Sequence, residues 1–202
     1  MENELNRWYK KLWETKGSRF IAAKRYERHE KWSTITISLV SVYIICINLL
    51  VFVPNRPKIL SDINITLSTI GLSIIVIVIS IILNNMGYKH LSNRFHDCGR
   101  EIAIIYDKLC LLKIKSENVS LEDLEEISTE YNSVLRKYNI NHSSLDYEVF
   151  QKNHIKDYPG IKYSYLFQSW VFLRYQFDTL GRYFVFILIP IALYYIFIKH
   201  ST

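Results

Sequence analysis

The chain lacks the short motifs that mark common catalytic and metal-binding sites. It contains no Gly-rich phosphate loop, no H-E-x-x-H, no C-x-x-C pair and no G-x-S-x-G. Its three cysteines have no metal-site or redox-motif spacing, so we interpret them as free buried thiols: Cys46, Cys98 and Cys110. No candidate nucleophile has a plausible base. We therefore expect no enzyme, no cofactor and no bound metal ion.

The histidines do not combine into a site either. His90 and His96 are six residues apart, so they do not share a helix face. The tripeptide Asn-His-Ser at 141–143 allows two interpretations, a ligand site or a helix terminus. The second is favoured, because such residues commonly hydrogen-bond to the nearby backbone.

Charge is missing from two long apolar runs. Ile35–Val53 contains 19 residues and Ile63–Leu83 contains 21, all without a formal charge. A bilayer core about 30 Å thick needs roughly 20 helical residues for one crossing. The intervening loop, residues 54–62, is too short for a domain. The two runs therefore predict a membrane-spanning helical hairpin.

Basic residues predict the orientation of this hairpin. Residues 1–32 carry nine Lys and Arg residues, residues 84–115 carry six, and the loop between the runs carries two. Basic flanks favour the cytoplasmic side. We expect a multi-pass protein of the inner membrane, with its N-terminus and middle segment in the cytoplasm. The basic residues that give the net charge of +6 are then attracted to anionic lipid. No direct nucleic-acid binding is expected.

The segments outside the runs predict cytoplasmic helices. Residues 1–31 form an amphipathic pattern, which fits a membrane-surface helix, a partner-binding helix or a helix packed on a cytoplasmic bundle. After the second run, apolar residues recur at spacings of 4 and 3, as in a heptad seam. These residues form the candidate assembly seam: Leu91, Phe95, Cys98, Ile102, Ile105, Leu109 and Leu112.

No proline separates this seam from the second run, so we predict one long helix from Ile63 to about Lys115. Ser120 with Asp123 resembles a capping box that begins another helix. That helix should fold back antiparallel on the first. Tyr183–Ile198, 16 residues without charge around Pro190, predicts a third membrane-inserted helix; a re-entrant or interfacial helix remains an alternative.

Small polar residues also follow a heptad inside the two runs, so each set lies along one helix face. Two interpretations compete: close packing of transmembrane helices, or the lining of a pore assembled from several chains. The candidate residues, here called the polar stripe, are Ser41, Asn48, Thr66, Thr69, Ser73 and Ser80.

The expected fold class is an all-α membrane protein: a transmembrane helical hairpin whose second span continues into a cytoplasmic helical bundle, plus a third membrane-inserted C-terminal helix. Four segments follow. They are an amphipathic cytoplasmic helix at 1–31, the two-span hairpin at 32–87, a cytoplasmic helical hairpin and loop at 88–160, and an aromatic segment with an apolar membrane helix at 161–202.

Four sequence stretches resemble a known family. YKHLSNRFHDCGREI at 88–102, followed by YDKL at 106–109, resembles the post-span helix of the SLATT proteins, the SMODS- and SLOG-associating two-transmembrane effectors of prokaryotic conflict systems. The stretches YNSVL at 131–135 and NHSSLDYEVF at 141–150 look like the fifth SLATT family in particular. The resemblance spans most of the chain.

This resemblance implies an effector of anti-phage defence, which assembles as a homo-oligomer in the lipid bilayer, breaches the membrane and kills the infected cell. The expected partner is a sensor from a nucleotide-signal synthase or reverse transcriptase system. The chain has no recognisable ligand-binding domain of its own. A non-conducting membrane anchor or scaffold for a soluble enzyme is the alternative, and a regulated channel or transporter subunit is a further one.

Overall fold

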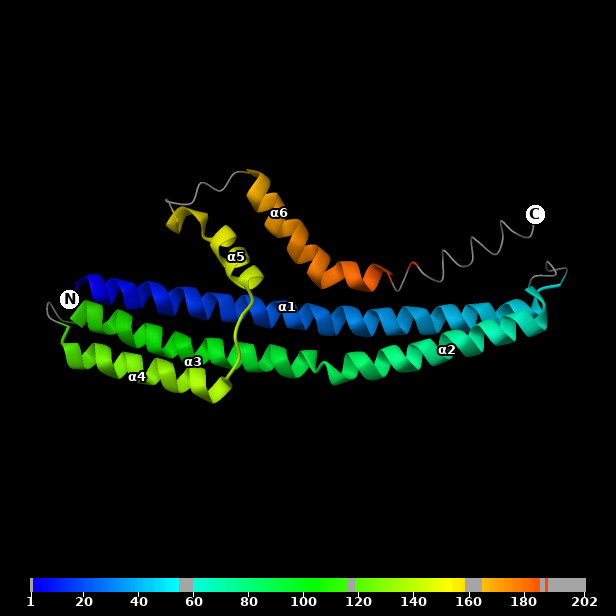
Figure 1. The fold of residues 1–202 in the computed structure, drawn as a ribbon, viewed down its shortest axis with the longest axis horizontal. Helices are drawn as coiled ribbons and strands as arrows, with labels where there is room; N and C mark the ends of the chain where they lie inside the picture. Colours follow the sequence, from blue (N-terminus) through cyan, green and yellow to red (C-terminus); the bar gives the residue numbers. More distant parts are fainter. Residues whose placement is uncertain (1, 55–59, 116–118, 159–164, 186–187, 189–202) are drawn as a thin grey trace. The chain divides into compact units, whose positions relative to one another are not determined.

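The computed structural model is helical and describes residues 2–54, 60–115, 119–158, 165–185 and 188. The main helices are α1 (Glu2–Leu49), α2 (Asp62–Asn85), α3 (Tyr88–Lys115), α4 (Leu121–Tyr138), α5 (Ser144–Asn153) and α6 (Tyr165–Gln176) (Figure 1). The described residues also include short helical turns: η1 (Leu50–Phe52), η3 (Ile155–Asp157) and the π-helical η4 (Phe177–Gly181). Across the described ranges there is no strand, so the predicted all-α class is confirmed.

The chain divides into two compact units, which we treat separately. The bundle unit contains residues 1–27 and 89–175, and the hairpin unit contains residues 28–88 and 176–202. Helix α1 contributes its first part to the bundle unit and its second part to the hairpin unit. It is continuous because its 48 residues include no proline and a single glycine, Gly17.

In the bundle unit, α3 and α4 lie alongside the first part of α1 (Figure 1). Leu12 of α1, Ile102 of α3 and Ile127 of α4 are fully buried in one apolar core. Burial of each such side chain stabilises the fold by about 1.5–3 kcal/mol. The N-terminal segment thus packs on the bundle, one of the interpretations that its amphipathic pattern allowed.

Helix α4 folds back on α3, as predicted. Ser120 and Asp123 form the predicted capping box at its start. Lys108 of α3 pairs with Glu126 at 2.8 Å and Glu130 at 2.7 Å, and these hydrogen bonds raise the pKa of Lys108. These contacts fix the register of the two helices.

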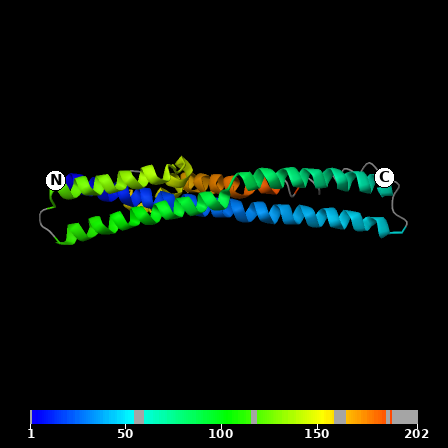
Figure 2. The same cartoon turned by 90° about the horizontal axis from the view of Figure 1, so that it is seen from below.

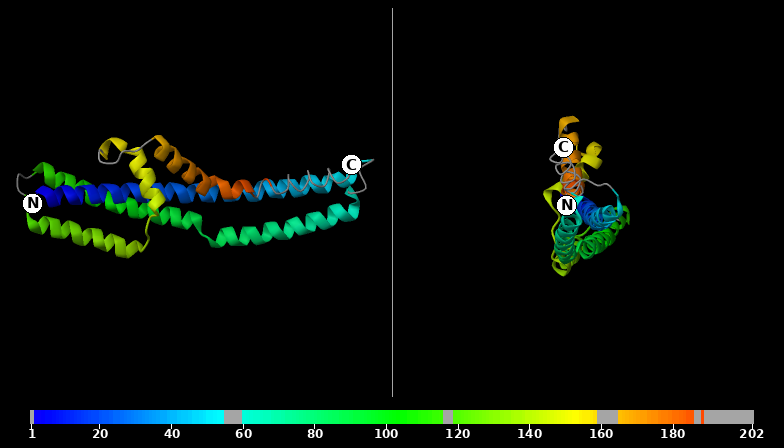
Figure 3. Two further views of the ribbon diagram at one scale, coloured as in Figure 1. Left: turned by 45° about the horizontal axis from the view of Figure 1, so that its top comes forward. Right: turned by 90° about the vertical axis from the view of Figure 1, so that its right-hand side faces the viewer.

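Helix α5 lies near the first part of α1 (Figure 3), and aromatic side chains form the contact between them. Phe150 lies edge-on to Trp13, with ring centroids 4.7 Å apart, and it covers the backbone at Gly17. A second capping box, Ser143 with Asp146, begins this helix. The helix-terminus interpretation of the tripeptide at 141–143 is therefore confirmed.

In the hairpin unit, α2 runs alongside the second part of α1 (Figure 2). The predicted single helix from Ile63 to Lys115 is wrong at one place, because α2 ends at Asn85 and α3 begins at Tyr88. Gly87 between them has a φ of +58°, a left-handed conformation that ends helices. The proposed third membrane helix lies outside the described residues, apart from 183–185 and 188.

Candidate functional site

Two helical stretches are long and apolar enough to cross a membrane, and they belong to α1 and α2. Only 6% and 11% of their most apolar windows are buried within the chain. On α2, Ile63, Leu67 and Ile77 are each more than half exposed. A soluble protein rarely exposes so large an apolar surface, whereas lipid tails would cover it. The exposed apolar surface of α1 and α2 is therefore the first candidate functional feature.

The polar stripe does not lie on a uniformly covered face. Thr69 is buried. Ser41, Ser73 and Ser80 are half-buried, whereas Asn48 and Thr66 are exposed. The stripe residues therefore meet other parts of the hairpin unit to different degrees.

Five of the six stripe side chains donate hydrogen bonds to their own helix. Ser73 donates to the carbonyl oxygen of Thr69 at 2.7 Å, and Ser80 donates to that of Val76 at 2.7 Å. Thr69 donates to Thr66 at 3.0 Å, and the same pattern joins Ser41 to Ile37 and Asn48 to Ile44. Such bonds satisfy polar donors at membrane depth without water. Because the hydroxyl protons are already donated within the helix, these hydroxyls can only accept hydrogen bonds from a neighbouring group.

Sequence reasoning missed a second polar line on α1. His29, Ser33 and Thr36 are buried in the hairpin unit, with exposed fractions of 1%, 5% and 2%. Their spacings of 4 and 3 place them on one helix face and could have identified them. That face differs from the face of the predicted stripe. The buried face of α1 is therefore the one that carries His29.

His29 connects α1 to the segment that follows α6. Its Nε2 lies 3.3 Å from Asp178 Oδ2, and its Nδ1 lies 3.2 Å from the hydroxyl of Tyr183. The ring also stacks on Tyr88, with centroids 5.0 Å apart. Arg182 donates to the other Asp178 oxygen at 2.5 Å. These contacts fasten residues 178–183 to the buried face of α1.

The candidate assembly seam is buried inside the bundle unit of the single chain. Four of its members are buried in the core that α1 and α4 share: Cys98, Ile102, Ile105 and Leu109. Phe95 is buried against Ala22 and Ala23 of α1. The two members at its ends, Leu91 and Leu112, are half-buried. Burial raises the pKa of the Cys98 thiol, which keeps it protonated. Assembly of several chains through this seam stays a prediction, and it would require these contacts to be exchanged.

A buried ion pair joins α1 to the start of α5. Arg25 Nε lies 2.8 Å from Asp146 Oδ1, and Arg25 Nη2 lies 3.1 Å from Asp146 Oδ2. Asp146 also accepts from the backbone N–H and the hydroxyl of Ser143. The two charge-assisted hydrogen bonds of this bidentate arrangement hold α5 against α1.

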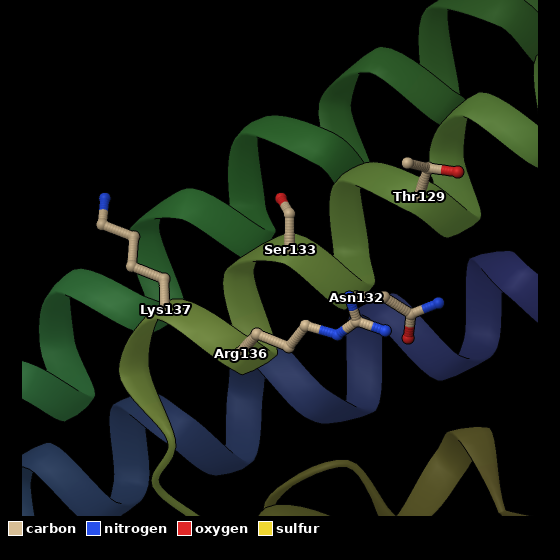
Figure 4. A pocket seen from close by; sticks show the side chains of 5 residues that line it. All are labelled: Thr129, Asn132, Ser133, Arg136 and Lys137. Carbon is tan, nitrogen blue, oxygen red and sulfur yellow. The ribbon is translucent and has the colours of Figure 1, made fainter.

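A surface hollow on α4 is lined by Thr129, Asn132, Ser133, Arg136 and Lys137 (Figure 4). All five residues come from one helix, and the side chain of Arg136 extends toward Asn132 (Figure 4). Lys137 is held by an ion pair to Glu101. The hydrogen bond between them lowers the pKa of Glu101 and raises that of Lys137. Within the described part of the chain, no three His, Cys, Asp or Glu residues are grouped to hold a metal ion.

Comparison with known proteins agrees with this arrangement. Residues 1–196 match the model of the SMODS and SLOG-associating 2TM effector domain family 5. No curated protein and no solved structure matches the chain. The match covers nearly the whole sequence and includes both helices that could cross a membrane. The chain therefore belongs to family 5 of the SMODS and SLOG-associating two-transmembrane effector domains.

Proposed function

We propose that this chain is a membrane-disrupting effector of a prokaryotic anti-phage system, acting by abortive infection. It assembles as a homo-oligomer in the inner membrane when a partner sensor is triggered, and it opens a pore. The observation that carries the proposal is the membership of a two-transmembrane effector family together with two helices whose apolar sides are exposed. The trigger is a sensor from a nucleotide-signal synthase or reverse transcriptase system.

The polar stripe supports a pore rather than a purely structural pair of spans. Two helices cannot enclose a water path, so several chains must surround it. In such an assembly the oxygen lone pairs of Ser73 and Ser80 would face water, because their protons already bond within α2. Lipid would cover the exposed isoleucines on the remaining faces of the helix.

Helix α1 supplies a route from the bundle unit to the membrane. It is one uninterrupted helix from Glu2 to Leu49, and it contributes residues to both units. A partner that displaces α3 or α4 from Leu12 would also free the first part of α1 to move. We propose that this movement reaches the spans through α1.

The proposal is tested by leakage from cells that express the chain with and without its genomic neighbours. A potential-sensitive dye and a membrane-impermeant nucleic-acid dye report ion and solute passage. We expect leakage that coincides with growth arrest, and we expect Ser73→Leu with Ser80→Leu to abolish it while expression and assembly persist. The matched control is Ile74→Leu with Ile81→Leu, which changes exposed apolar residues of the same helix.

The alternative function is a non-conducting anchor or scaffold for a soluble partner enzyme. The observation in its favour is the acidic first half of α4, where Glu122 and Glu125 are exposed. Asp123 and Glu126 of the same patch are engaged with Ser120 and Lys108. An intact membrane potential in cells with confirmed insertion would favour the anchor and reject the pore.

A further inference from the structure

Arg19 on α1 carries a buried charge. Its side chain lies in the bundle unit, and the residue is 3% exposed. Its Nε and Nη1 are buried, and no group in the described ranges accepts a hydrogen bond from either. An unpaired buried cation costs several kcal/mol relative to water. Such a residue needs an explanation.

The neighbouring residues do not neutralise Arg19. Asp146 is near enough to interact electrostatically, but both of its oxygens accept from Arg25. Cys98 is also near, but burial raises the pKa of its thiol, which is therefore neutral. The ring of Phe95 lies 5.7 Å from the Arg19 guanidinium carbon and offers a π face without accepting hydrogen bonds in the plane of that group.

His142 is a second unpaired polar group on this side of α1, because Ile140, two residues before it, packs against the cluster of Phe95, whose ring lies under Arg19. It lies on the connection between α4 and α5, and its buried Nδ1 has no hydrogen-bond partner in the part of the chain that the structure describes. Burial lowers the pKa of His142, and the positive charge of Arg19 lowers it further. The hydroxyl of Ser18, adjacent to Arg19 in the chain, is likewise buried and has no partner among the described residues. Buried polar side chains without a hydrogen-bond partner are unusual in a folded protein.

We propose that Arg19 and His142 form an anion site that binds a phosphate group, either as inorganic phosphate or as the phosphate of a nucleotide. The unpaired N–H groups at Nε and Nη1 lie on different edges of the guanidinium plane, so one anion binds one edge. A phosphate group has several acceptor oxygens, so it can accept from that edge and from the imidazole at the same time. The negative charge would compensate Arg19, and His142 would become a better donor in its presence.

The position of the site gives binding a structural effect. Arg19 belongs to α1 and contacts α3 through Phe95, while His142 precedes the capping residue Ser143 of α5. A phosphate held by both residues joins α1 to the connection between α4 and α5. Binding therefore stabilises the packed form of the bundle unit, whether or not the chain forms a pore.

The test uses the full chain in detergent micelles, with thermal unfolding followed by circular dichroism. Inorganic phosphate and adenosine monophosphate are added separately at constant ionic strength, with chloride as the reference anion. At a hundredfold excess over the dissociation constant, the midpoint should rise by roughly 5–10 °C. A rise with phosphate identifies the free anion as sufficient, and a rise with the nucleotide alone identifies a phosphate ester.

Two variants separate this site from other basic surfaces. Arg19→Met removes the buried charge but keeps an apolar side chain, so in chloride it should unfold at the same temperature as the natural chain or a higher one. It should lose the response to phosphate. Arg136→Gln, in the exposed hollow on α4, should keep that response. The proposal is overturned if neither anion raises the midpoint, if Arg19→Met still responds, or if Arg136→Gln alone abolishes the response.

Discussion

The guanidinium of Arg25 donates through Nε and Nη2 to both carboxylate oxygens of Asp146, although 121 residues separate the two in the chain. The side chain of Arg25 is 11% exposed and that of Asp146 is fully buried. Asp146 also caps α5 through Ser143. One carboxylate thus begins a helix and fastens it to another.

Replacing Arg25 alone should therefore destabilise the bundle unit. Arg25→Met leaves the Asp146 charge buried without its cation, which costs about 3–5 kcal/mol of unfolding free energy. The double variant Arg25→Met with Asp146→Asn should recover a large part of this loss, because the neutral amide keeps the capping bonds. Chemical denaturation of the detergent-solubilised chain, with hydrogen exchange of the α5 amides, measures both effects.

An exposed ion pair provides the control for this prediction. Arg174 pairs with Glu148 at 3.1 Å, but its side chain is 45% exposed. Arg174→Met should change the unfolding free energy by about 1 kcal/mol or less. If the double variant at Arg25 and Asp146 loses as much as the two single losses summed, the two side chains do not act as a pair.

Gly17 should not tolerate a side chain. A Cβ atom at this position would overlap the ring of Phe150, which packs directly on the backbone of α1. We expect Gly17→Ala to lower the unfolding free energy by about 1–3 kcal/mol through overpacking, despite the better helix propensity of alanine. Denaturant titration measures the loss, and Phe150→Leu in the same chain should restore part of it.

The comparison for Gly17 is Gly71 on α2. No atom lies within 4 Å of a Cβ built there, so Gly71→Ala should leave stability unchanged or raise it slightly. An equal loss in both variants would show that the effect comes from the backbone rather than from Phe150.

Gly87 offers a test of the interruption between α2 and α3. Its φ of +58° disfavours residues with a Cβ, while no atom lies within 4 Å of the position that a Cβ would take. Gly87→Ala should therefore cost about 1–2 kcal/mol through backbone strain alone. Gly87→Asn should cost less, because asparagine tolerates the left-handed region. Thermal unfolding compares the two, and equal losses would contradict a left-handed residue at 87.

Local patterns predicted the helices well because their causes lie within a few residues. The capping box at Ser120 and Asp123 is an interaction over three residues, and the apolar spacing around Ile102 follows from one helix turn. The break at Gly87 had a local cause too. A glycine shortly after Asn84 and Asn85 is typical of a helix end, where it takes the left-handed conformation. The prediction counted only the average cost of glycine inside a helix, about 1 kcal/mol, and so missed the break.

The polar contacts could not be predicted in the same way. Arg25 and Asp146 meet only because α5 folds back on α1, and no pattern in either segment identifies the other. Arg19 and the connection that holds His142 likewise lie near each other through tertiary packing, since both Arg19 and Ile140 meet the cluster of Phe95. Helix α1 has two polar faces, and its sequence does not tell which one the rest of the chain covers. In the structure the covered face is the one with Ser33 and Thr36.

His142 should make the stability of the bundle unit depend on pH. Burial, with the charge of Arg19, lowers its folded-state pKa below the ordinary value of 6.5. The unfolded chain therefore binds more protons between the folded-state pKa and 6.5, so stability is complete above pH 6.5 and is lost as pH falls toward the lower value. Unfolding of the natural chain and of His142→Asn between pH 5 and 7.5, in chloride, should show this slope only in the former.

Phosphate gives the same titration a second readout. A bound phosphate anion beside the imidazole favours its protonated form, so the His142 pKa should rise when phosphate replaces chloride. The slope below pH 6.5 should then become shallower, because the folded and unfolded values approach each other. Proton NMR of the His142 ring follows that pKa directly. An unchanged pKa in phosphate would place any bound anion away from His142, while an unchanged slope in His142→Asn would assign the pH dependence to another group.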